Sequence, residues 1–186
     1  MEQDADKSIP STGDRDGSAL CRTCGLCCRG VWFSHVKLDG SEIESARRLG
    51  LPIEMVNGHA QFQQSCVLHD GKGCTAYQTW RPRRCMEYRC SLLNRFDAGE
   101  VTFDEARRHV ITARAIADRV QNEVGPIAGG LLGNALLNRL EATPGGDING
   151  VPPLPLPPMT KLDAVALRIY FDRHFRKGKP PPREEV

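Results

Sequence analysis

The clearest apolar pattern in the chain lies between residues 102 and 124, where apolar side chains recur at intervals of three and four residues. This spacing is the period of an amphipathic helix. Thr102 and Glu105 form a capping box at its start, and Gly125 followed by Pro126 ends it. The predicted buried face consists of Phe103, Ala106, Val110, Ala113, Ala117, Val120 and Val124.

A second helical pattern begins at Thr160, and Asp163 stands where it can cap the first turn. We expect this final helix to end near Gly178. Its predicted apolar face consists of Leu162, Val165, Ala166, Ile169 and Tyr170. Between the two helices we expect a glycine-rich helical segment at 131–140 and a polyproline II connector at 151–158.

The first hundred residues show extended patterns as well. Val31–Leu38 is rich in β-forming residues, and Ala60–Leu68 is a second extended stretch that can pair with it. Asp70–Gly73 supplies the residues of a tight turn. Cys66 and Cys74 should therefore flank a hairpin-like loop.

One short helix is predicted between these extended stretches. Ser41 and Glu44 match a capping box, and Gly50 and Pro52 are stop signals. We therefore expect a helix from Glu42 to Leu49.

Together these elements predict an α+β fold: a small, mostly helical single domain with irregular cysteine-lined loops and a short β-hairpin. The domain is expected to span residues 20–178, with a cysteine-cluster region at 20–92 and helices at 102–177. Residues 1–19 and 179–186 have no apolar face, so we expect a disordered leader and a disordered tail.

Composition narrows the function classes. The 186 residues are 40% hydrophobic and 26% charged, which is ordinary for one globular domain. The net charge of +2 gives no general attraction to nucleic acid or to anionic membranes, so neither is an expected partner. The apolar stretch Ile127–Leu137 is interrupted by glycines and is too short to cross a bilayer. The first twenty residues contain no apolar stretch of the kind a secretory signal needs, so we expect a cytoplasmic protein.

Eight cysteines carry the strongest chemical signal. They are Cys21, Cys24, Cys27, Cys28, Cys66, Cys74, Cys85 and Cys90. The opening run C-x2-C-x2-C-C can bring several sulfurs to one side of a tight backbone loop, which suits metal coordination. Cytoplasmic thiols stay reduced, and the adjacent Cys27 and Cys28 are poorly placed for disulfides. We therefore predict that all eight are metal ligands and that the cysteine-lined loops are metal-binding loops.

The spacing favours an iron–sulfur cluster, with zinc as the alternative. Zinc modules usually pair two C-x2-C knuckles around one ion, whereas this chain has one such region. Three cysteines stepping by three, with a distant cysteine beyond Pro82, resemble the ligand pattern of bacterial ferredoxins. Eight thiols exceed the need of one cluster, and Cys28 is the best candidate to leave the first site for a second metal.

Other side chains near the cysteines have weaker claims. His69 forms C-x2-H with Cys66, but a lone histidine beside a turn is more often solvated or hydrogen-bonded than metal-bound. Thiolate charge can be offset by nearby arginines, although a solvated basic surface explains any single one equally well. The arginines within four residues of a cysteine are Arg22, Arg29, Arg81, Arg83, Arg84 and Arg89.

Five motifs occur in a fixed order: Cys21–Gly30, Ser41–Ile43, Cys66–Leu68, Gly73–Tyr77 and Arg81–Cys85. In this order and spacing they resemble the YkgJ-type cysteine-cluster (CxxCxxCC) family over about residues 20–92. The resemblance implies chelation of zinc or iron by the matched cysteines. It also implies a remote link to flagellin lysine methylases, which share this domain.

Three function classes agree with these observations. The first is a metal-binding protein that holds an iron–sulfur cluster or zinc and acts in electron transfer, sensing or metal handling. The second is an iron–sulfur-dependent protein lysine methylase-like enzyme, which is weakened because no GxGxxG-like loop follows a predicted strand. The third is a structural zinc module that serves a protein partner. The sequence leaves open whether the protein is an enzyme.

Overall fold

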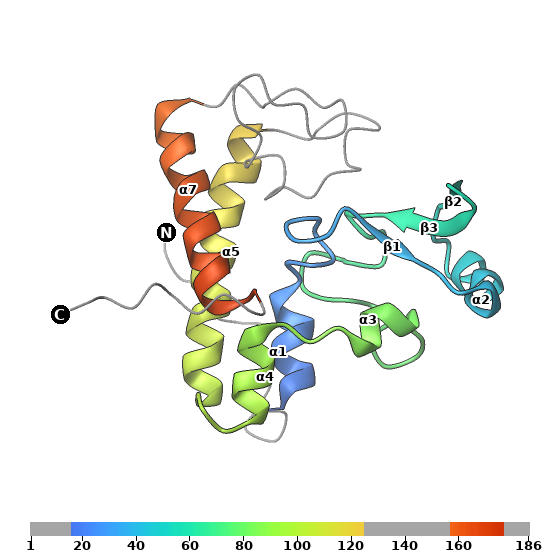
Figure 1. Ribbon diagram of the computed structural model, residues 1–186, viewed down its shortest axis with the longest axis horizontal. Coiled ribbons are helices and arrows are strands. Elements are labelled where there is room, and N and C mark those ends of the chain that lie inside the picture. Colours follow the sequence, from blue (N-terminus) through green and yellow to red (C-terminus); the bar gives the residue numbers. More distant parts are fainter. Residues whose placement is uncertain (1–15, 125–156, 177–186) are drawn as a thin grey trace.

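The computed structural model describes residues 16–124 and 157–176, and Figure 1 shows its arrangement. The largest part is helical. Helices α5 (Phe103–Val124) and α7 (Pro158–His174) pack side by side, while α1 (Gly17–Cys24) and α4 (Ser91–Asp97) pack against one end of α5. Helix α1 begins at Gly17, within the segment for which the sequence suggests a leader.

Helix α5 follows the sequence prediction closely. Thr102 accepts a hydrogen bond from the Glu105 backbone N–H at 3.2 Å, and the Glu105 carboxylate accepts one from the Thr102 backbone N–H at 2.7 Å. This is the predicted capping box. The predicted face is buried at Ala106, Val110, Ala113, Ala117 and Val120. The side chain of Val124 lies outside the described residues.

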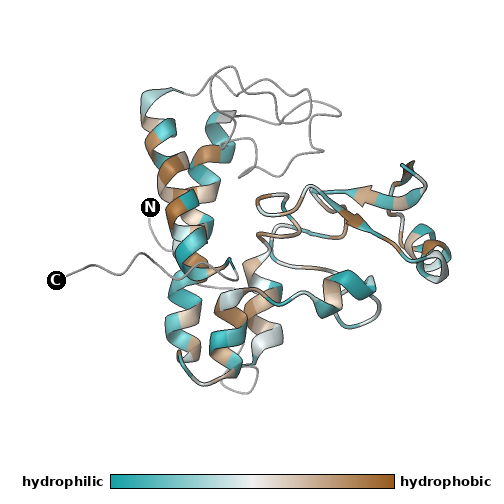
Figure 2. Cartoon of the chain, in the orientation of Figure 1, coloured by the Kyte–Doolittle hydropathy of each residue, from teal (hydrophilic) through white to brown (hydrophobic). Residues whose placement is uncertain are grey.

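Helix α7 buries a different face from the one that the sequence suggested. The buried residues are Thr160, Ala164, Leu167 and Phe171. The predicted residues Leu162, Val165 and Ile169 are 63%, 56% and 62% exposed. Figure 2 shows several hydrophobic residues along α7, so apolar spacing alone does not choose between its faces.

The chosen face of α7 carries the features that close packing needs. The aromatic ring of Phe171 supplies the larger buried surface, and the small Ala164 allows α5 to approach. The helix also begins at Pro158 and ends at His174, rather than near Gly178.

A three-stranded antiparallel sheet lies away from α5 and α7 (Figure 1). Its strands are β1 (His35–Lys37), β2 (Ile53–Val56) and β3 (His59–Gln63), in the order β1-β3-β2. The predicted pairing of the two extended stretches is confirmed by β1 and β3, both of which are shorter than expected. Strand β2 was not predicted, although Asn57-Gly58 between β2 and β3 is a strong hairpin signal.

Two short helical elements complete the sheet region. A 3-10 turn, η1 (Gly40–Glu42), leads into α2 (Ile43–Arg48), and α3 (Arg83–Glu87) packs against β1. The predicted capping box of Ser41 and Glu44 is wrong by two residues. The Asp39 backbone N–H donates to the Glu42 carboxylate at 2.8 Å, because the chain turns at Asp39 before α2 begins.

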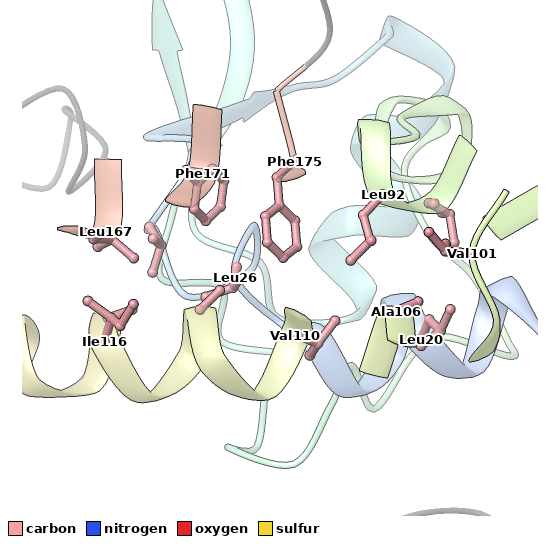
Figure 3. Packing of buried hydrophobic residues seen from close by; sticks show 14 of the residues in the cluster. Leu20, Leu26, Leu92, Val101, Ala106, Val110, Ile116, Leu167, Phe171 and Phe175 are labelled. Atoms are coloured by element: carbon pink, nitrogen blue, oxygen red, sulfur yellow. The ribbon is translucent and has the colours of Figure 1, made fainter. Parts of the chain in front are cut away.

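Two separate hydrophobic clusters hold these parts together. The helical core joins α1, α4, α5 and α7, and its largest members include Leu26, Leu167 and Phe171 (Figure 3). The sheet core consists of Val36, Leu38, Ala46, Leu51, Ala60 and Phe62. The cysteine-rich loops connect the two clusters.

The predicted helix at 131–140 and most of the predicted connector at 151–158 lie outside the described residues. None of the helices in the described part of the chain is long and apolar enough to cross a membrane.

Candidate metal centre

The N-terminal cysteine run folds as the end of a helix followed by a loop. Cys21 and Cys24 lie on α1, one turn apart and therefore on the same side of the helix. Gly25 ends the helix in the left-handed conformation, with a φ of 62°. Cys27 and Cys28 follow in the loop that leads toward the sheet.

The remaining cysteines come from three other places. Cys66 and Cys74 lie in the loop after β3, and an antiparallel bridge between His69 and Cys74 confirms the predicted hairpin-like loop. Cys85 lies on α3, and Cys90 immediately precedes α4 as its N-cap residue. All eight cysteines are free of disulfides.

Five of the cysteines line one cavity: Cys21, Cys24, Cys27, Cys28 and Cys90. We call four of them, Cys21, Cys24, Cys27 and Cys90, the cavity group. The packing of α1 against α4 brings Cys90 to the N-terminal run. Burial raises the pKa of the Cys27 thiol well above its ordinary value, and the neighbouring Cys24 and Cys21 thiols raise it further. Cys21 is exposed as a residue, yet burial of its thiol also raises its pKa.

The cavity has a volume of about 70 Å³ and mostly apolar walls. Its lining includes Leu26, Trp32, Leu92, Phe171 and Phe175, and Figure 3 shows Leu26 close to the two phenylalanines. A single water needs about 10–15 Å³ of such volume. The cavity is therefore large enough for a group of several atoms and is too large for one bare metal ion.

The other three thiols lie outside the cavity lining and act on Cys28, and we call these four the loop group: Cys28, Cys66, Cys74 and Cys85. Burial raises the pKa of Cys28, and the thiols of Cys66, Cys74 and Cys85 are the next largest causes. Burial likewise raises the pKa of Cys85 to about 12, followed by the effects of Cys66 and Cys74. Cys28 therefore lies on the cavity wall and also near the thiols of Cys66, Cys74 and Cys85.

Backbone N–H groups and an arginine favour the thiolate form at some of these positions. Burial raises the pKa of Cys24 to about 12, while an N–H of Leu26 and the guanidinium of Arg114 act in the opposite direction. Burial raises the pKa of Cys66, and the N–H of Leu68 opposes this rise. Arg114, on α5, is distant from every cysteine in the sequence, so no local pattern points to it.

The arginines near the cysteines act in two ways. Arg81 and Arg89 lower the pKa of Cys21 against the effect of burial, as the prediction of charge compensation requires. Arg29, Arg83 and also Arg89 form ion pairs with carboxylates. Only some of the predicted arginines therefore offset the charge of a cysteine thiolate.

His69 packs against the cysteine run without joining either group. Its Nδ1 accepts a hydrogen bond from the Gly71 backbone N–H at 3.2 Å. Its Nε2 lies so close to Gly25 that a Cβ at that glycine would overlap it. His69 therefore fixes the position of the loop beside Cys24, and Gly25 is required both for its φ and for this close approach.

The donor set fits a thiophilic metal group. In the described part of the chain, no three cysteine, histidine, aspartate or glutamate side chains are arranged to hold a single metal ion as they stand. The cavity group instead lines a space larger than one ion.

Removal of the apolar wall should expose the centre. Leu26 is 1% exposed, lines the cavity and belongs to the helical core. We expect Leu26→Ala to lower the free energy of unfolding by about 2–5 kcal/mol and to let water and oxygen reach the cavity. Leu51→Ala in the sheet core is the matched control, since Leu51 is 4% exposed and does not line the cavity.

The measurements are urea unfolding and the rate at which metal is lost in air. Both variants should be destabilised, but only Leu26→Ala should lose its metal faster than the unchanged protein. Equal rates of loss in the two variants would show that Leu26 does not shield the metal.

The comparisons with known proteins agree with this chemistry. No curated protein and no solved structure matches the chain. The family model CxxCxxCC, described as "Putative zinc- or iron-chelating domain", matches residues 20–110, a range that contains all eight cysteines. The match supports metal binding and confirms the resemblance seen in the sequence. Residues 20–110 of this chain are thus similar to the CxxCxxCC family.

Proposed function

We propose that the protein is a one-electron carrier that holds a four-iron cluster through Cys21, Cys24, Cys27 and Cys90. The observation that carries this proposal is the cavity of about 70 Å³, which these four thiols line together with Cys28 and apolar side chains. A single zinc ion would leave most of such a space empty. A compartment in which thiols stay reduced, such as the cytoplasm, suits this function.

The number of thiols indicates the role of the cluster. Four thiolates occupy the four corners of a cubane, so no corner remains open for a substrate. A bound cluster would supply one-electron transfer at a potential set by its charge, hydrogen bonds and exposure. The chain contributes ligands, N–H donors such as that of Leu26, and the apolar wall.

The surroundings offset the charge of such a centre. An oxidised four-iron cluster with four thiolates carries a net charge of about minus two, which costs free energy in an apolar site. Arg114 acts on Cys24, and Arg81 and Arg89 act on Cys21. These guanidinium groups favour the thiolates without themselves coordinating metal.

The cavity gives less support to the other two functions. Its lining contains no carboxylate, histidine or lysine, and a protein methylase needs a base to deprotonate the substrate lysine. A purely structural zinc site would be expected to close its thiolates around one ion, which the cavity group does not do.

A redox titration tests the proposal. Protein reconstituted with iron and sulfide under anaerobic conditions should show broad visible absorbance that dithionite bleaches, with a paramagnetic signal from the reduced cluster. Reoxidation should restore the absorbance over repeated cycles, because a fully thiolate-ligated cluster loses no ligand on reduction. A cluster that forms but is destroyed by a single reduction would contradict the role as an electron carrier.

A further inference from the structure

Three ring-bearing side chains join the C-terminal end of α7 to α5. Nδ1 of His109, on α5, and the hydroxyl of Tyr170, on α7, form a hydrogen bond at 2.8 Å. The imidazole rings of His109 and His174 stack with their centroids 3.9 Å apart and an interplanar angle of 27°. The ring of Tyr170 lies 4.5 Å from that of His174. We call these three residues the histidine cluster.

The stacked pair suits two neutral imidazoles. Nδ1 of His174 is buried and has no hydrogen-bond partner among the residues that the structure describes. A protonated imidazole has two N–H donors, so protonation of His174 would leave one of them buried without an acceptor. Two charged rings at the observed separation from His109 would also repel each other. The packing of α7 on α5 therefore favours the neutral form of both rings.

The charged groups around the pair come from every helix packed against it. They are Arg95 on α4, Glu105 and Arg108 on α5, and Arg173 on α7. Burial lowers the pKa of His109, and the three arginines lower it further, whereas Glu105 raises it. Burial lowers the pKa of His174 to about 4, and His109 is the next largest cause. Protonation of the pair thus opposes the packing of the two helices.

The same end of α7 forms part of the cavity wall. Phe171 and Phe175 line the cavity, and Phe175 directly follows the last residue of the histidine cluster. The carbonyl oxygen of Phe175 accepts a hydrogen bond from the Ser91 backbone N–H at 2.9 Å, and Ser91 follows the cavity-group residue Cys90. Separation of this end of α7 from α5 would therefore remove an apolar wall and release the start of α4.

We propose that the histidine cluster is an acid-sensitive latch, which holds the C-terminal end of α7 against α5 and thereby keeps the cavity closed. While both imidazoles are neutral, the two helices pack. When acid protonates them, this end of α7 separates from α5 and water enters the cavity. The N-terminal half of α7 is held by the ion pair of Arg119 with Asp163 at 2.7 Å, so it stays in place. The latch does not depend on which metal the cavity takes.

The pH dependence of urea unfolding tests the latch. A histidine whose pKa is lower in the folded protein than in the unfolded chain stabilises the fold above the unfolded pKa of about 6.5, and this contribution is lost as the pH falls. His174→Phe keeps a ring that can stack on His109 but cannot be protonated. From about pH 7 to about pH 5, the unfolding equilibrium constant of the unchanged full-length protein should rise about 3–10-fold more than that of His174→Phe.

His59→Phe is the matched control, because His59 is an exposed histidine on β3, in the sheet region. Its unfolding should depend on pH as that of the unchanged protein does. The same pH dependence in the unchanged protein and in His174→Phe would overturn the latch.

Hydrogen exchange of the unchanged protein tests the opening without any variant. Amides at the C-terminal end of α7, and the Ser91 amide that donates to Phe175, should lose protection at about pH 5 after correction for the intrinsic pH dependence of exchange. Amides of β3 should keep their protection, because the sheet core is separate from the helical core. Loss of protection in α7 and β3 alike, or in neither of them, would overturn the proposed latch.

Discussion

Cys24→Ser should abolish the iron–sulfur absorbance of the protein. Cys24 is a cavity-group residue on α1, and its sulfur accepts a hydrogen bond from the backbone N–H of Leu26. Serine lacks the soft sulfur that iron–sulfur clusters require, and the buried hydroxyl would remain protonated. Changes outside the ligand shell already reduce metal affinity by about 10–100-fold, so loss of a ligand should reduce iron and sulfide content by at least this factor.

Cys85→Ser is the matched control for this change. Cys85 is also partly buried, and burial raises its pKa to about 12, as it does for Cys24. It belongs to the loop group and does not line the cavity. Cys85→Ser should therefore keep the iron–sulfur absorbance. Retention of the full absorbance by Cys24→Ser would contradict the assignment of this cysteine as a ligand.

Gly25→Ala should lower both the free energy of unfolding and the iron content of the protein. Gly25 has a φ of 62°, and this conformation is about 1–2 kcal/mol less favourable for a residue with a Cβ. The added Cβ would also overlap Nε2 of His69, so the loop that carries Cys27 must shift. A displaced Cys27 thiol leaves one corner of the cluster poorly held. We expect a lower urea midpoint together with a several-fold loss of iron.

Two further variants separate the causes. Gly50→Ala tests the conformational cost alone, because Gly50 has a φ of 76° and no atom lies within 4 Å of its added Cβ. It should lower the urea midpoint slightly and leave the iron content unchanged. In Gly25→Ala/His69→Ala the overlap is removed, so part of the iron should return. Equal effects of Gly25→Ala and Gly50→Ala would show that the contact with His69 does not matter.

Local signals in the sequence were sufficient to predict several helices and strands. The capping box at Thr102 and Glu105 and the periodic face of α5 depend on residues within one helix, and both are confirmed. The pairing of β1 with β3 was also predictable, because both stretches have β-forming residues. The missed strand β2 had a usable signal in Asn57-Gly58, which is a typical hairpin turn.

Other features depend on contacts between distant segments. The buried face of α7 is chosen by its fit to α5, and Leu162 and Leu167 are equally apolar in the sequence. The division of the cysteines into two groups depends on how α4 and α3 pack, although the adjacent Cys27 and Cys28 suggested that one thiol would leave the first site. The effect of Arg114 on Cys24 could not be predicted either, because the two residues are far apart in the sequence.

Iron and acid-labile sulfide analysis of protein purified without oxygen or chelators tests the central claim most directly. The cavity group predicts about four iron and four sulfide per chain, because each of its thiolates holds one corner of a cubane. A colourless protein that holds only zinc after anaerobic reconstitution with iron and sulfide, or one whose cavity-group thiols are paired in disulfides, would contradict it.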